Sequence, residues 1–314
     1  MEGLSIVIPI YNRASLIERT LRSVAASTML PHDLILVDNG STDQSAEICR
    51  RWAALHSSES FRVTVLSADR KGASVARNVG LQACSTEFVY FFDSDDLFDP
   101  AFIADATSAL KAGSAPDLLL LDTCQEVNGR TQRRSARHDS APHTHILNSQ
   151  LNTISMLFRT AFLRQIGGWN ETLTVWDDWE LGLRALLARP KVRWLTPKAY
   201  HHVFVHTDSQ TSSSFTQTLH PTLAAMRAAL THVRQSLWPD RDKVRFLRAL
   251  FFRSRIMEGH LLREGCADGA RLYHLFAAEV LPDADTWVRL TGRLLGHYTR
   301  FGGRGAWRLA LMLV

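Results

Sequence analysis

The sequence has 314 residues, of which 46% are hydrophobic and 21% charged, and this composition excludes a disordered, collagen-like or fibrous protein. The formal net charge of +5 is mild for this length and argues against a dedicated nucleic-acid-binding protein, so we expect no nucleic acid as a partner. The four cysteines are far apart and form no C-x-x-C pair, which argues against a zinc knuckle or a disulfide framework and predicts a cytoplasmic protein.

The first hundred residues alternate between short apolar runs and helical patterns. No basic region precedes the first run, and Pro9 interrupts it, so we expect no signal peptide. Strands are predicted over 5–10, 33–37, 62–66 and 88–92, and helices over 16–24, from 42 or 43 to 52, and over 73–84. Apolar strands that alternate with helices predict an α/β fold with a mostly parallel sheet flanked by helices.

The rest of the sequence predicts a less regular half and a helical tail. Residues 126–150 are polar and rich in Arg and His, which predicts a long, irregular and flexible acceptor loop. A strand and then a helix are predicted over 152–162, a turn at 167–169, a helix over 178–188, and helices from 220 onward. We therefore predict a first domain over 1–215, with halves at about 1–100 and 101–215, and a basic helical C-terminal region over 216–314. No run reaches the roughly 18 apolar residues of a membrane-spanning helix.

Polar residues follow three of the predicted strands. Tyr11 and Asn12 come after the first strand, Asp38 after the second, and the acidic cluster 93–96 after the fourth. Ligands of parallel α/β sheets bind beyond the carboxyl ends of the strands. These three segments are therefore expected to meet in one crevice.

The acidic cluster 93–96 places three carboxylates at one strand end. They repel each other unless a cation or solvent offsets their charge. Mg²⁺ prefers oxygen ligands, often one or two carboxylates plus substrate phosphates, and Mn²⁺ also accepts imidazole. The alternative is a solvated turn in which Asp96 or Asp99 caps the next helix.

Five sequence segments, in this order, resemble the family 2 inverting glycosyltransferases of GT-A fold. They are SIVIPIYN (5–12), VDNGSTD (37–43), GASVARN (72–78), FDSDD (92–96), and GGWNE (167–171) followed by DDWE (177–180). The resemblance covers about residues 4–210 and implies a GT-A type sheet with a C-terminal helical extension. It leaves the tail uncovered.

The resemblance implies a binding site for the nucleotide of a sugar donor. Pro9, Tyr11 and Asn12 would line the nucleotide pocket. Asp38 would accept a hydrogen bond from the base, as in uridine-binding members. The alternative for the residues at 39–41 is ordinary turn chemistry.

The resemblance also implies residues for the diphosphate and the metal. Lys71 and Arg77 match basic residues near the base or the diphosphate, although Arg77 has the alternative of a solvated helix residue. Asp93 and Asp95 match the D-x-D motif, in which Asp93 faces the ribose or sugar and Asp95 ligates the metal.

A late histidine and two tryptophans complete the implied site. His206 is predicted to complete the metal site, with a structural histidine as the alternative, and His201 or His202 as substitutes. Trp169 and Trp176 are predicted to floor the sugar or acceptor site, with a core position as the alternative.

An inverting transfer also needs a base for the acceptor hydroxyl. Asp178 matches the catalytic acid pair of the family, and the dipole of the predicted 178–188 helix favours its ionised form. Asp177, where many members have Glu, would be its partner on the acceptor side. The alternative is that both carboxylates only cap this helix.

Positive charge is concentrated in the tail, because residues 1–219 carry a net −2 and residues 220–314 a net +7. One basic row recurs every three or four residues and would lie on a single helical face if one helix continues past Gly302, Gly303 and Gly305. A second basic set lies among large apolar residues. The two sets are Arg289, Arg293, His297, Arg300, Arg304 and Arg308, and Arg241, Lys243, Arg245, Arg248, Arg253 and Arg255. Basic, apolar helices suit peripheral contact with an anionic membrane; the alternative is packing on one side and solvent on the other.

Together these features predict a metal-dependent inverting glycosyltransferase that uses Mn²⁺ or Mg²⁺. The expected donor is a nucleotide-diphospho-sugar, specifically a UDP-sugar, and the acceptor is a glycan or lipid-linked hydroxyl in bacterial cell-surface polysaccharide synthesis. The alternative is an inactive nucleotide-sugar-binding relative or a partner subunit. A nucleotidyltransferase or an NAD enzyme is disfavoured because no Gly-rich phosphate loop follows the first strand.

Overall fold

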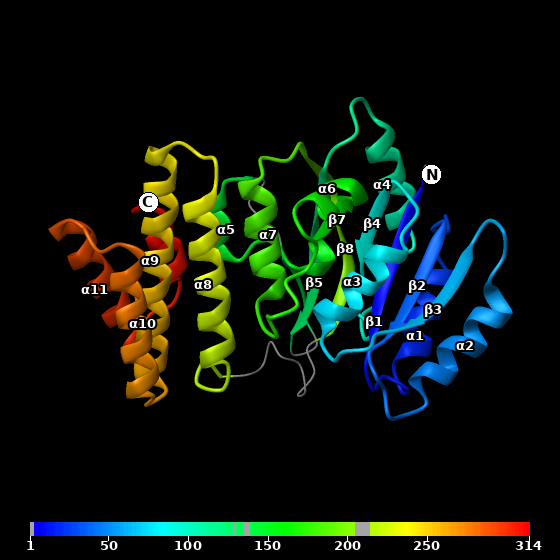
Figure 1. The fold of residues 1–314 in the computed structure, drawn as a ribbon, viewed down its shortest axis with the longest axis horizontal. Coiled ribbons are helices and arrows are strands. Elements are labelled where there is room, and N and C mark those ends of the chain that lie inside the picture. Colours follow the sequence, from blue (N-terminus) through cyan, green and yellow to red (C-terminus); the bar gives the residue numbers. More distant parts are fainter. Residues whose placement is uncertain (1–2, 128–129, 135–138, 205–213) are drawn as a thin grey trace. The chain divides into compact units, whose positions relative to one another are not determined.

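A computed structural model describes residues 3–127, 130–134, 139–204 and 214–314 (Figure 1). The chain forms two compact units, each built from separate segments. Unit 1 comprises Met1–His138, Leu151–Thr174 and Pro190–Thr207, and unit 2 comprises Asp139–Gln150, Val175–Arg189 and Asp208–Val314. The domain boundary expected at 215 stays a prediction.

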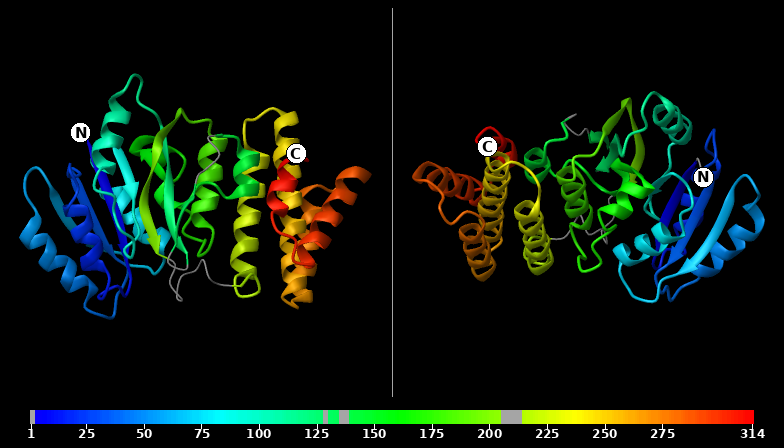
Figure 2. Two further views of the ribbon diagram at one scale, coloured as in Figure 1. Left: turned by 180° about the vertical axis from the view of Figure 1, so that it is seen from behind. Right: turned by 45° about the horizontal axis from the view of Figure 1, so that its top comes forward.

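Unit 1 is built on one mixed sheet, whose order in the described residues is β3-β2-β1-β4-β7-β5-β6, with β8 paired to β5 (Figure 2). The strands are β1 (Leu4–Ile10), β2 (Asp33–Asp38), β3 (Arg62–Ser67), β4 (Phe88–Phe91), β5 (Leu118–Val127), β6 (Arg130–Arg134), β7 (Met156–Arg159) and β8 (Val192–Phe204). Strands β1 to β4 are mutually parallel, β7 is antiparallel to both β4 and β5, and β6 is antiparallel to β5. The predicted α/β class is confirmed.

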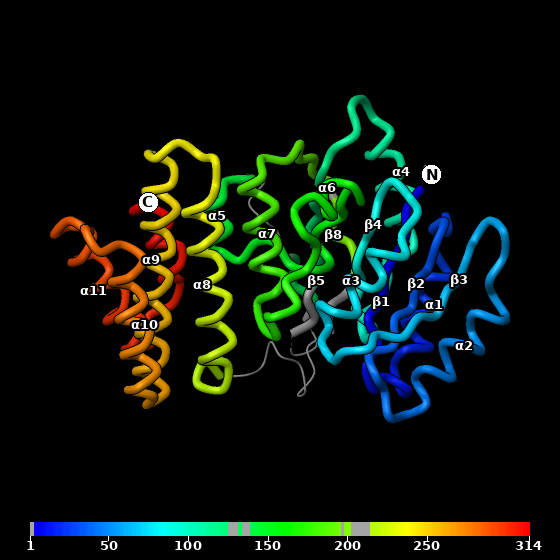
Figure 3. The backbone as a smooth tube through the Cα atoms, viewed as in Figure 1, coloured from blue at the N-terminus to red at the C-terminus, as the bar shows by residue number. Residues whose placement is uncertain are grey.

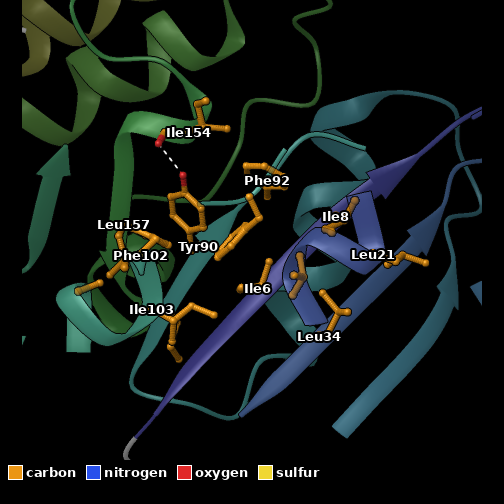
Figure 4. Close-up of a cluster of buried hydrophobic side chains, with 14 of the residues drawn as sticks. Ile6, Ile8, Leu21, Leu34, Tyr90, Phe92, Phe102, Ile103, Ile154 and Leu157 are labelled. Atoms are coloured by element: carbon orange, nitrogen blue, oxygen red, sulfur yellow. Dashed lines mark hydrogen bonds between the residues drawn. The ribbon is translucent and has the colours of Figure 1, made fainter. Parts of the chain in front are cut away.

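Helices cover both faces of this sheet. The helices and turns of unit 1 are α1 (Ile17–Ala25), α2 (Ser45–His56), α3 (Ala73–Ala83), α4 (Phe102–Lys111), the 3-10 turn η1 (Thr153–Ser155) and α6 (Thr160–Gln165). On one face Ile6, Ile8 and Leu34 share a buried cluster with Leu21 of α1 (Figure 4). On the other face α3 lies so close to β1 that a Cβ added to Gly80 would be 2.3 Å from Val7.

The same buried cluster extends to α4 and η1. Tyr90 of β4 lies with its ring centroid 4.7 Å from that of Phe102 in α4, and its hydroxyl donates to the carbonyl of Ile154 at 2.6 Å (Figure 4). A buried hydroxyl is costly unless it is hydrogen-bonded. This bond therefore fixes the middle of the sheet, next to the strand end that carries the acidic cluster.

Unit 2 is helical, with no strand among its described residues. Its helices are α5 (Pro142–Asn148), α7 (Asp177–Leu187), α8 (Leu219–Gln235), α9 (Asp240–Arg263), α10 (Ala267–Val280), α11 (Thr286–Arg300) and α12 (Ala306–Leu311). The long helix α9 packs against α5, α8, α10, α11 and α12, and its course is followed in Figure 3. Helix α11 approaches it closely, because a Cβ on Gly292 would lie 2.5 Å from Phe251. The predicted C-terminal helical extension is confirmed.

The expectation of one irregular loop over 126–150 is wrong for the described residues. Strand β5 reaches Val127, β6 pairs with it, and α5 follows. The polar composition has two local causes. Strand β6 lies at the sheet edge with Thr131 and Arg133 exposed, as is common for charged edge strands. In α5 the His145 ring is fully buried and pairs with the carbonyl of Trp179 at 2.8 Å.

Two expectations about the basic tail are also corrected. One helix does not continue over 289–308, so the condition for a single basic face is not met: α11 ends at Arg300, and the chain turns at Gly302 and Gly305, both with positive φ, before α12. In the second basic set, Arg253 and Arg255 are buried, so the packing alternative holds for them. Within the described ranges no helix has both the length and the apolar character needed to span a membrane.

Candidate functional site

The loops that follow β1 and β2 are joined by hydrogen bonds. Asn12 adopts a left-handed backbone, with φ 51°, which asparagine tolerates better than most residues. Its Oδ1 accepts a hydrogen bond from the backbone N–H of Thr42 at 2.8 Å, and its own N–H donates to Oγ of Ser41 at 3.1 Å. Pro9 precedes this loop, past the last residue of β1 that pairs with β4, and Tyr11 is 44% exposed.

Asp38 is the last residue of β2 and is largely buried. Its Oδ1 accepts a hydrogen bond from the backbone N–H of Ser41 at 3.3 Å. Its carbonyl accepts another from Ala68, just beyond β3, at 2.9 Å. The carboxylate is therefore fixed at the carboxyl end of the sheet, where α/β folds bind ligands.

The neighbouring Asn39 organises the loop that leads into α3. Its Nδ2 donates to the carbonyl of Arg70 at 2.8 Å, and its Oδ1 accepts from the backbone N–H of Gly72 at 2.7 Å. Gly72 has φ 139°, a conformation that favours glycine. Lys71 lies between Arg70 and Gly72 in this loop, and its Nζ is 5.4 Å from the ring centroid of Tyr11. Two predicted nucleotide-pocket residues thus meet across the loops.

Arginines pair with both carboxylates of the D-x-D motif. Arg77, a buried residue of α3, places Nη2 2.9 Å from Oδ1 of Asp93. Arg13 places Nη2 3.4 Å from Oδ2 of Asp95, and Arg19 donates to the carbonyl of Asp95 at 2.7 Å. The carboxylates remain partly exposed, with side-chain exposures of 35% for Asp93 and 24% for Asp95.

Trp169 lies in the core behind Arg77. It is 2% exposed, meets the ring of Phe91 edge-on at 5.2 Å, and has its ring centroid 4.4 Å from the guanidinium carbon of Arg77. Asn78 accepts from the N–H of Trp169 at 2.8 Å and donates to Glu171 at 2.9 Å. This hydrogen bond from Asn78 lowers the pKa of the Glu171 carboxyl. The acceptor role of Trp169 stays a prediction.

The predicted base begins a helix of unit 2. Trp176 has a left-handed backbone, with φ 59°, and directly precedes α7, whose first turn contains Asp177 and Asp178. Both carboxylates are half-buried. Oδ1 of Asp178 accepts a hydrogen bond from the backbone N–H of Trp179 at 2.7 Å. A carboxylate at a helix N-terminus is stabilised in its ionised form, which is the form a general base requires.

Glu180, one turn further, is fully buried and has cationic partners. Arg184 donates to both of its oxygens, at 2.7 and 2.9 Å, and Nε2 of His232 lies 2.7 Å from Oε1. Burial alone would raise the pKa of Glu180, but the hydrogen bonds from Arg184 and His232 lower it below its ordinary value. This buried cluster ties α7 to α8.

The described residues offer carboxylates, but no three-residue cluster, for a metal ion. No group of three His, Cys, Asp or Glu side chains forms a metal site in the described part of the chain, and the predicted ligand His206 lies outside it. His201 accepts from the N–H of Asp99 at 3.1 Å and is buried among phenylalanine rings. The carboxylates of Asp93 and Asp95 suit an Mg²⁺ or Mn²⁺ ion that keeps phosphate ligands.

The sequence alone predicts no role for Arg13 or Asn78, and for Asn39 only ordinary turn chemistry. Arg13 directly follows the segment SIVIPIYN, and the other two lie inside VDNGSTD and GASVARN. A basic residue at the end of the first strand was the available signal for Arg13. The roles of Asn39 and Asn78 come from hydrogen bonds to loops about 30 and 90 residues away, which sequence spacing does not reveal.

Comparison with known proteins gives a family match and several relatives. Residues 5–166 match the family described as Glycosyl transferase family 2. Over 221 residues the chain is 28% identical to the poly(ribitol-phosphate) beta-N-acetylglucosaminyltransferase TarS of Staphylococcus aureus, covering 68% of this chain and 38% of TarS. It is 33% identical over 131 residues to the validoxylamine A glucosyltransferase of Streptomyces hygroscopicus, covering 40% and 28%. The chain therefore spans well under half the length of these relatives.

Solved structures resemble the fold of nearly the whole chain. The structure of S. aureus TarS 1–349 in complex with UDP-GlcNAc has a TM-score of 0.71 at 21% identity, covering 99% of this chain and 90% of that one. The mannosyltransferase PcManGT from Pyrobaculum calidifontis, in complex with GDP-Man and Mn²⁺, has a TM-score of 0.60 at 17% identity, covering 100% and 87%. The predicted GT-A type fold is confirmed.

Proposed function

Because the chain belongs to glycosyl transferase family 2, we propose that it is a metal-dependent, inverting enzyme that transfers a sugar from a UDP-sugar to a hydroxyl of a glycan or lipid-linked acceptor. The observation that carries this proposal is the set of polar residues at the ends of β1, β2 and β4, all inside the matched residues. We place the reaction in bacterial cell-surface polysaccharide synthesis at the cytoplasmic face of the membrane. The name of TarS, a poly(ribitol-phosphate) beta-N-acetylglucosaminyltransferase, supports a polymer acceptor.

Unit 1 would bind the donor. The buried carboxylate of Asp38 is suited to accept a hydrogen bond from the uracil N–H. Tyr11 and Lys71, which lie together, would contact the base or diphosphate, and Pro9 and Asn12 would shape the wall of the pocket. A buried polar group that loses its partner is costly, so this set would discriminate between bases.

The same edge of the sheet would hold the metal and the sugar. Asp95 and His206 would ligate Mg²⁺ or Mn²⁺, and Asp93, paired with Arg77, would face the ribose or sugar. A bound divalent ion supplies positive charge that stabilises the departing diphosphate. Arg13 supplies a second positive charge beside Asp95. Its ion pair with Asp95 would give way when that carboxylate binds a metal.

Unit 2 would supply the base. As the acceptor oxygen forms its bond to the anomeric carbon, the hydroxyl proton passes to Asp178. The bond from that carbon to the diphosphate oxygen breaks, and UDP leaves with the electron pair. Attack from the face opposite the leaving group inverts the anomeric centre. Asp177 and Trp176, which adjoin Asp178 in the sequence, would bind the acceptor.

The donor and the anomeric outcome can be tested together. Purified protein is incubated with Mn²⁺, ribitol-phosphate polymer and either UDP-GlcNAc, UDP-Glc or GDP-Man, and nucleotide release and product are measured. The structures of TarS with UDP-GlcNAc and of PcManGT with GDP-Man justify these donors. We expect release of UDP, and a β-linked product by proton NMR from the α-linked donor. Transfer from GDP-Man alone would overturn the UDP assignment, and retention of the α linkage would overturn inversion.

Helix α11 would bring the enzyme to the membrane. Its buried face is formed by Val288, Leu295 and small residues. Its exposed surface has an apolar stripe beside a basic row, and these sets occupy separate sectors at roughly 100° per residue. The stripe is Trp287, Leu290, Leu294, Tyr298 and Phe301, and the row is Arg289, Arg293, His297 and Arg300. No acidic residue occurs from 286 onward, so the charge suits an anionic bilayer.

Liposome flotation tests this contact. We expect the protein to float with phosphatidylglycerol vesicles and not with phosphatidylcholine vesicles. The double variant Trp287→Ser with Leu294→Ser should lose flotation, whereas Leu55→Ser, which changes a more exposed leucine in α2, should retain it. Equal flotation of all three proteins would exclude α11 as the contact.

A further inference from the structure

Unit 2 contains a buried arginine for which the described residues provide no carboxylate partner. Arg253, in the middle of α9, is 3% exposed. In the described ranges no acidic side chain lies within ion-pair distance of it, and its Nε has no hydrogen-bond acceptor. Burial lowers the pKa of Arg253 to about 9, so the guanidinium is still charged at neutral pH. A buried, unpaired cation is costly to a fold, and its presence therefore needs an explanation.

The partners of this guanidinium are carbonyls and aromatic rings. Nη1 of Arg253 donates to the carbonyl of Ile146 at 2.6 Å and to that of Leu147 at 3.4 Å. Both carbonyls lie in the last turn of α5, at the negative end of the helix dipole. The guanidinium carbon also lies 4.3 Å from the ring of Trp176, 4.8 Å from that of Trp179 and 4.9 Å from that of Trp307. Planar stacking and cation–π attraction suit arginine better than lysine here.

Two of these rings flank the predicted base in the sequence. Trp176 and Trp179 directly precede and follow Asp177 and Asp178, and their ring centroids are 5.5 Å apart. Trp176 holds a left-handed backbone, φ 59°, which non-glycine residues adopt only when their surroundings enforce it. Trp179 is fixed from the other side, since its Nε1 donates to the carbonyl of His145 at 3.3 Å.

We propose that Arg253 is a positioning residue: by clamping Trp176 and Trp179 it sets the direction in which the first turn of α7 presents Asp178. This inference rests on the proposed function, in which Asp178 is the base. It gives α9 and α12, which lie beyond the residues matched by the family, a part in the reaction. It also explains why a cation is kept at a site that an apolar side chain could fill.

A double-mutant cycle separates positioning from a purely structural role. The variants are Arg253→Met, Arg253→Lys, Asp178→Asn and their combinations. Arg253→Met keeps an unbranched apolar side chain but removes the charged guanidinium group and its hydrogen-bond donors. We expect Arg253→Met to lower kcat by about a hundredfold, as misplacement by about 1 Å can do, and Arg253→Lys to restore part of it. The affinity for UDP, measured by calorimetry, should not change. In the Asp178→Asn background, Arg253→Met should lower kcat no further.

The control is Arg245→Met, which changes an exposed arginine of α9 and should leave kcat unchanged. If Arg253→Met does not fold, Arg253→Lys is read in the same cycle. An active enzyme in which Arg253 variants keep full kcat, or lower it equally with and without Asp178, would overturn this inference and leave the proposed function intact. A wild-type protein that transfers no sugar would overturn both.

Discussion

The two units hold the carboxylates of the proposed site in different ways. In unit 1 Asp38 ends β2, and Asp93 and Asp95 follow β4 closely; each is held by a neighbouring loop N–H or an arginine. In unit 2 Asp178 lies in the first turn of α7. Trp179 of that helix and the preceding Trp176 pack on a buried arginine from α9. The carboxylates of unit 1 are positioned by the ends of sheet strands. Asp178 of unit 2 is positioned by the packing of helices on one another.

This difference explains which residues an amino-acid sequence reveals. A strand followed at once by polar residues is a local pattern, so Asp38, Asp93 and Asp95 could be singled out from the order of residues alone. The support of Asp178 comes from Arg253, 75 residues away in the sequence. If the comparison holds, changes in unit 1 should act on donor affinity and changes in unit 2 on turnover.

The largest expected effect is that of Asp178→Asn. Loss of a general base commonly lowers the rate by about 10² to 10⁴-fold, so we expect kcat to fall about a thousandfold. UDP affinity, measured by calorimetry, should stay within twofold of wild type. Asp268→Asn, which changes an exposed aspartate in the first turn of α10, is the matched control. A variant with near-normal turnover would show that Asp178 is not the base.

A second change tests the packing of α7. Glu180→Ala leaves Arg184 and His232 without their buried partner, and removal of one member of a buried ion pair costs about 3 kcal/mol. Denaturant unfolding should show that loss in the free energy of unfolding. Glu47→Ala, an exposed glutamate in the first turn of α2, should change it by less than about 0.5 kcal/mol. Equal losses for both would contradict the role given to Glu180.

Asp38→Asn tests unit 1. It keeps one side-chain oxygen for the N–H of Ser41 but replaces the second carboxylate oxygen, which would accept from the uracil N–H, with an NH2 group that can only donate. A hydrogen bond to a charged group contributes about 1.5–3 kcal/mol, so UDP should bind at least about tenfold more weakly. Calorimetry measures this, with the exposed Glu59→Gln as control. Unchanged UDP affinity would remove Asp38 from the base pocket.

The smallest expected effect is on the acid dependence of stability. The folded pKa of Glu180 lies below its ordinary value of 4.5, so the stabilisation it provides is present above pH 4.5 and is lost as pH falls through the folded pKa. The free energy of unfolding should therefore decline below pH 4.5, and more steeply in wild type than in Glu180→Gln. Parallel declines in the two proteins would show that other groups dominate.

Much of the fold could be predicted from the sequence, and the exceptions have physical causes. The runs at 5–10, 33–37 and 88–92 became β1, β2 and β4, which are buried along nearly their whole length, as strands covered on both faces are. The run at 62–66 became β3, a partly exposed strand at the end of the strand order. The prediction of an irregular loop over 126–150 was wrong for two reasons. Edge strands tolerate charged residues, and a buried histidine can form a hydrogen bond between its ring nitrogen and a carbonyl. Local composition does not show such pairing.

The candidate site, too, could be predicted from the sequence only where local patterns mark its residues. The pairs Arg77 with Asp93 and Lys71 with Tyr11 join residues that the motifs had already singled out. Arg253 was grouped with a basic set suited to a membrane, because sequence gives its charge and its apolar neighbours but not its burial. Only the packing of α5, α7, α9 and α12 reveals that it faces inward.

The central claim, a metal-dependent UDP site in unit 1 that is separate from the base in unit 2, is tested most directly by calorimetric titration. UDP, GDP and CDP are titrated with Mn²⁺ and then with EDTA into wild type, Asp95→Ala and Asp178→Asn. We expect UDP to bind wild type and Asp178→Asn alike, only with Mn²⁺, and to bind Asp95→Ala at least about tenfold more weakly. Binding that ignores EDTA and Asp95→Ala, or preference for another nucleotide, would contradict the account.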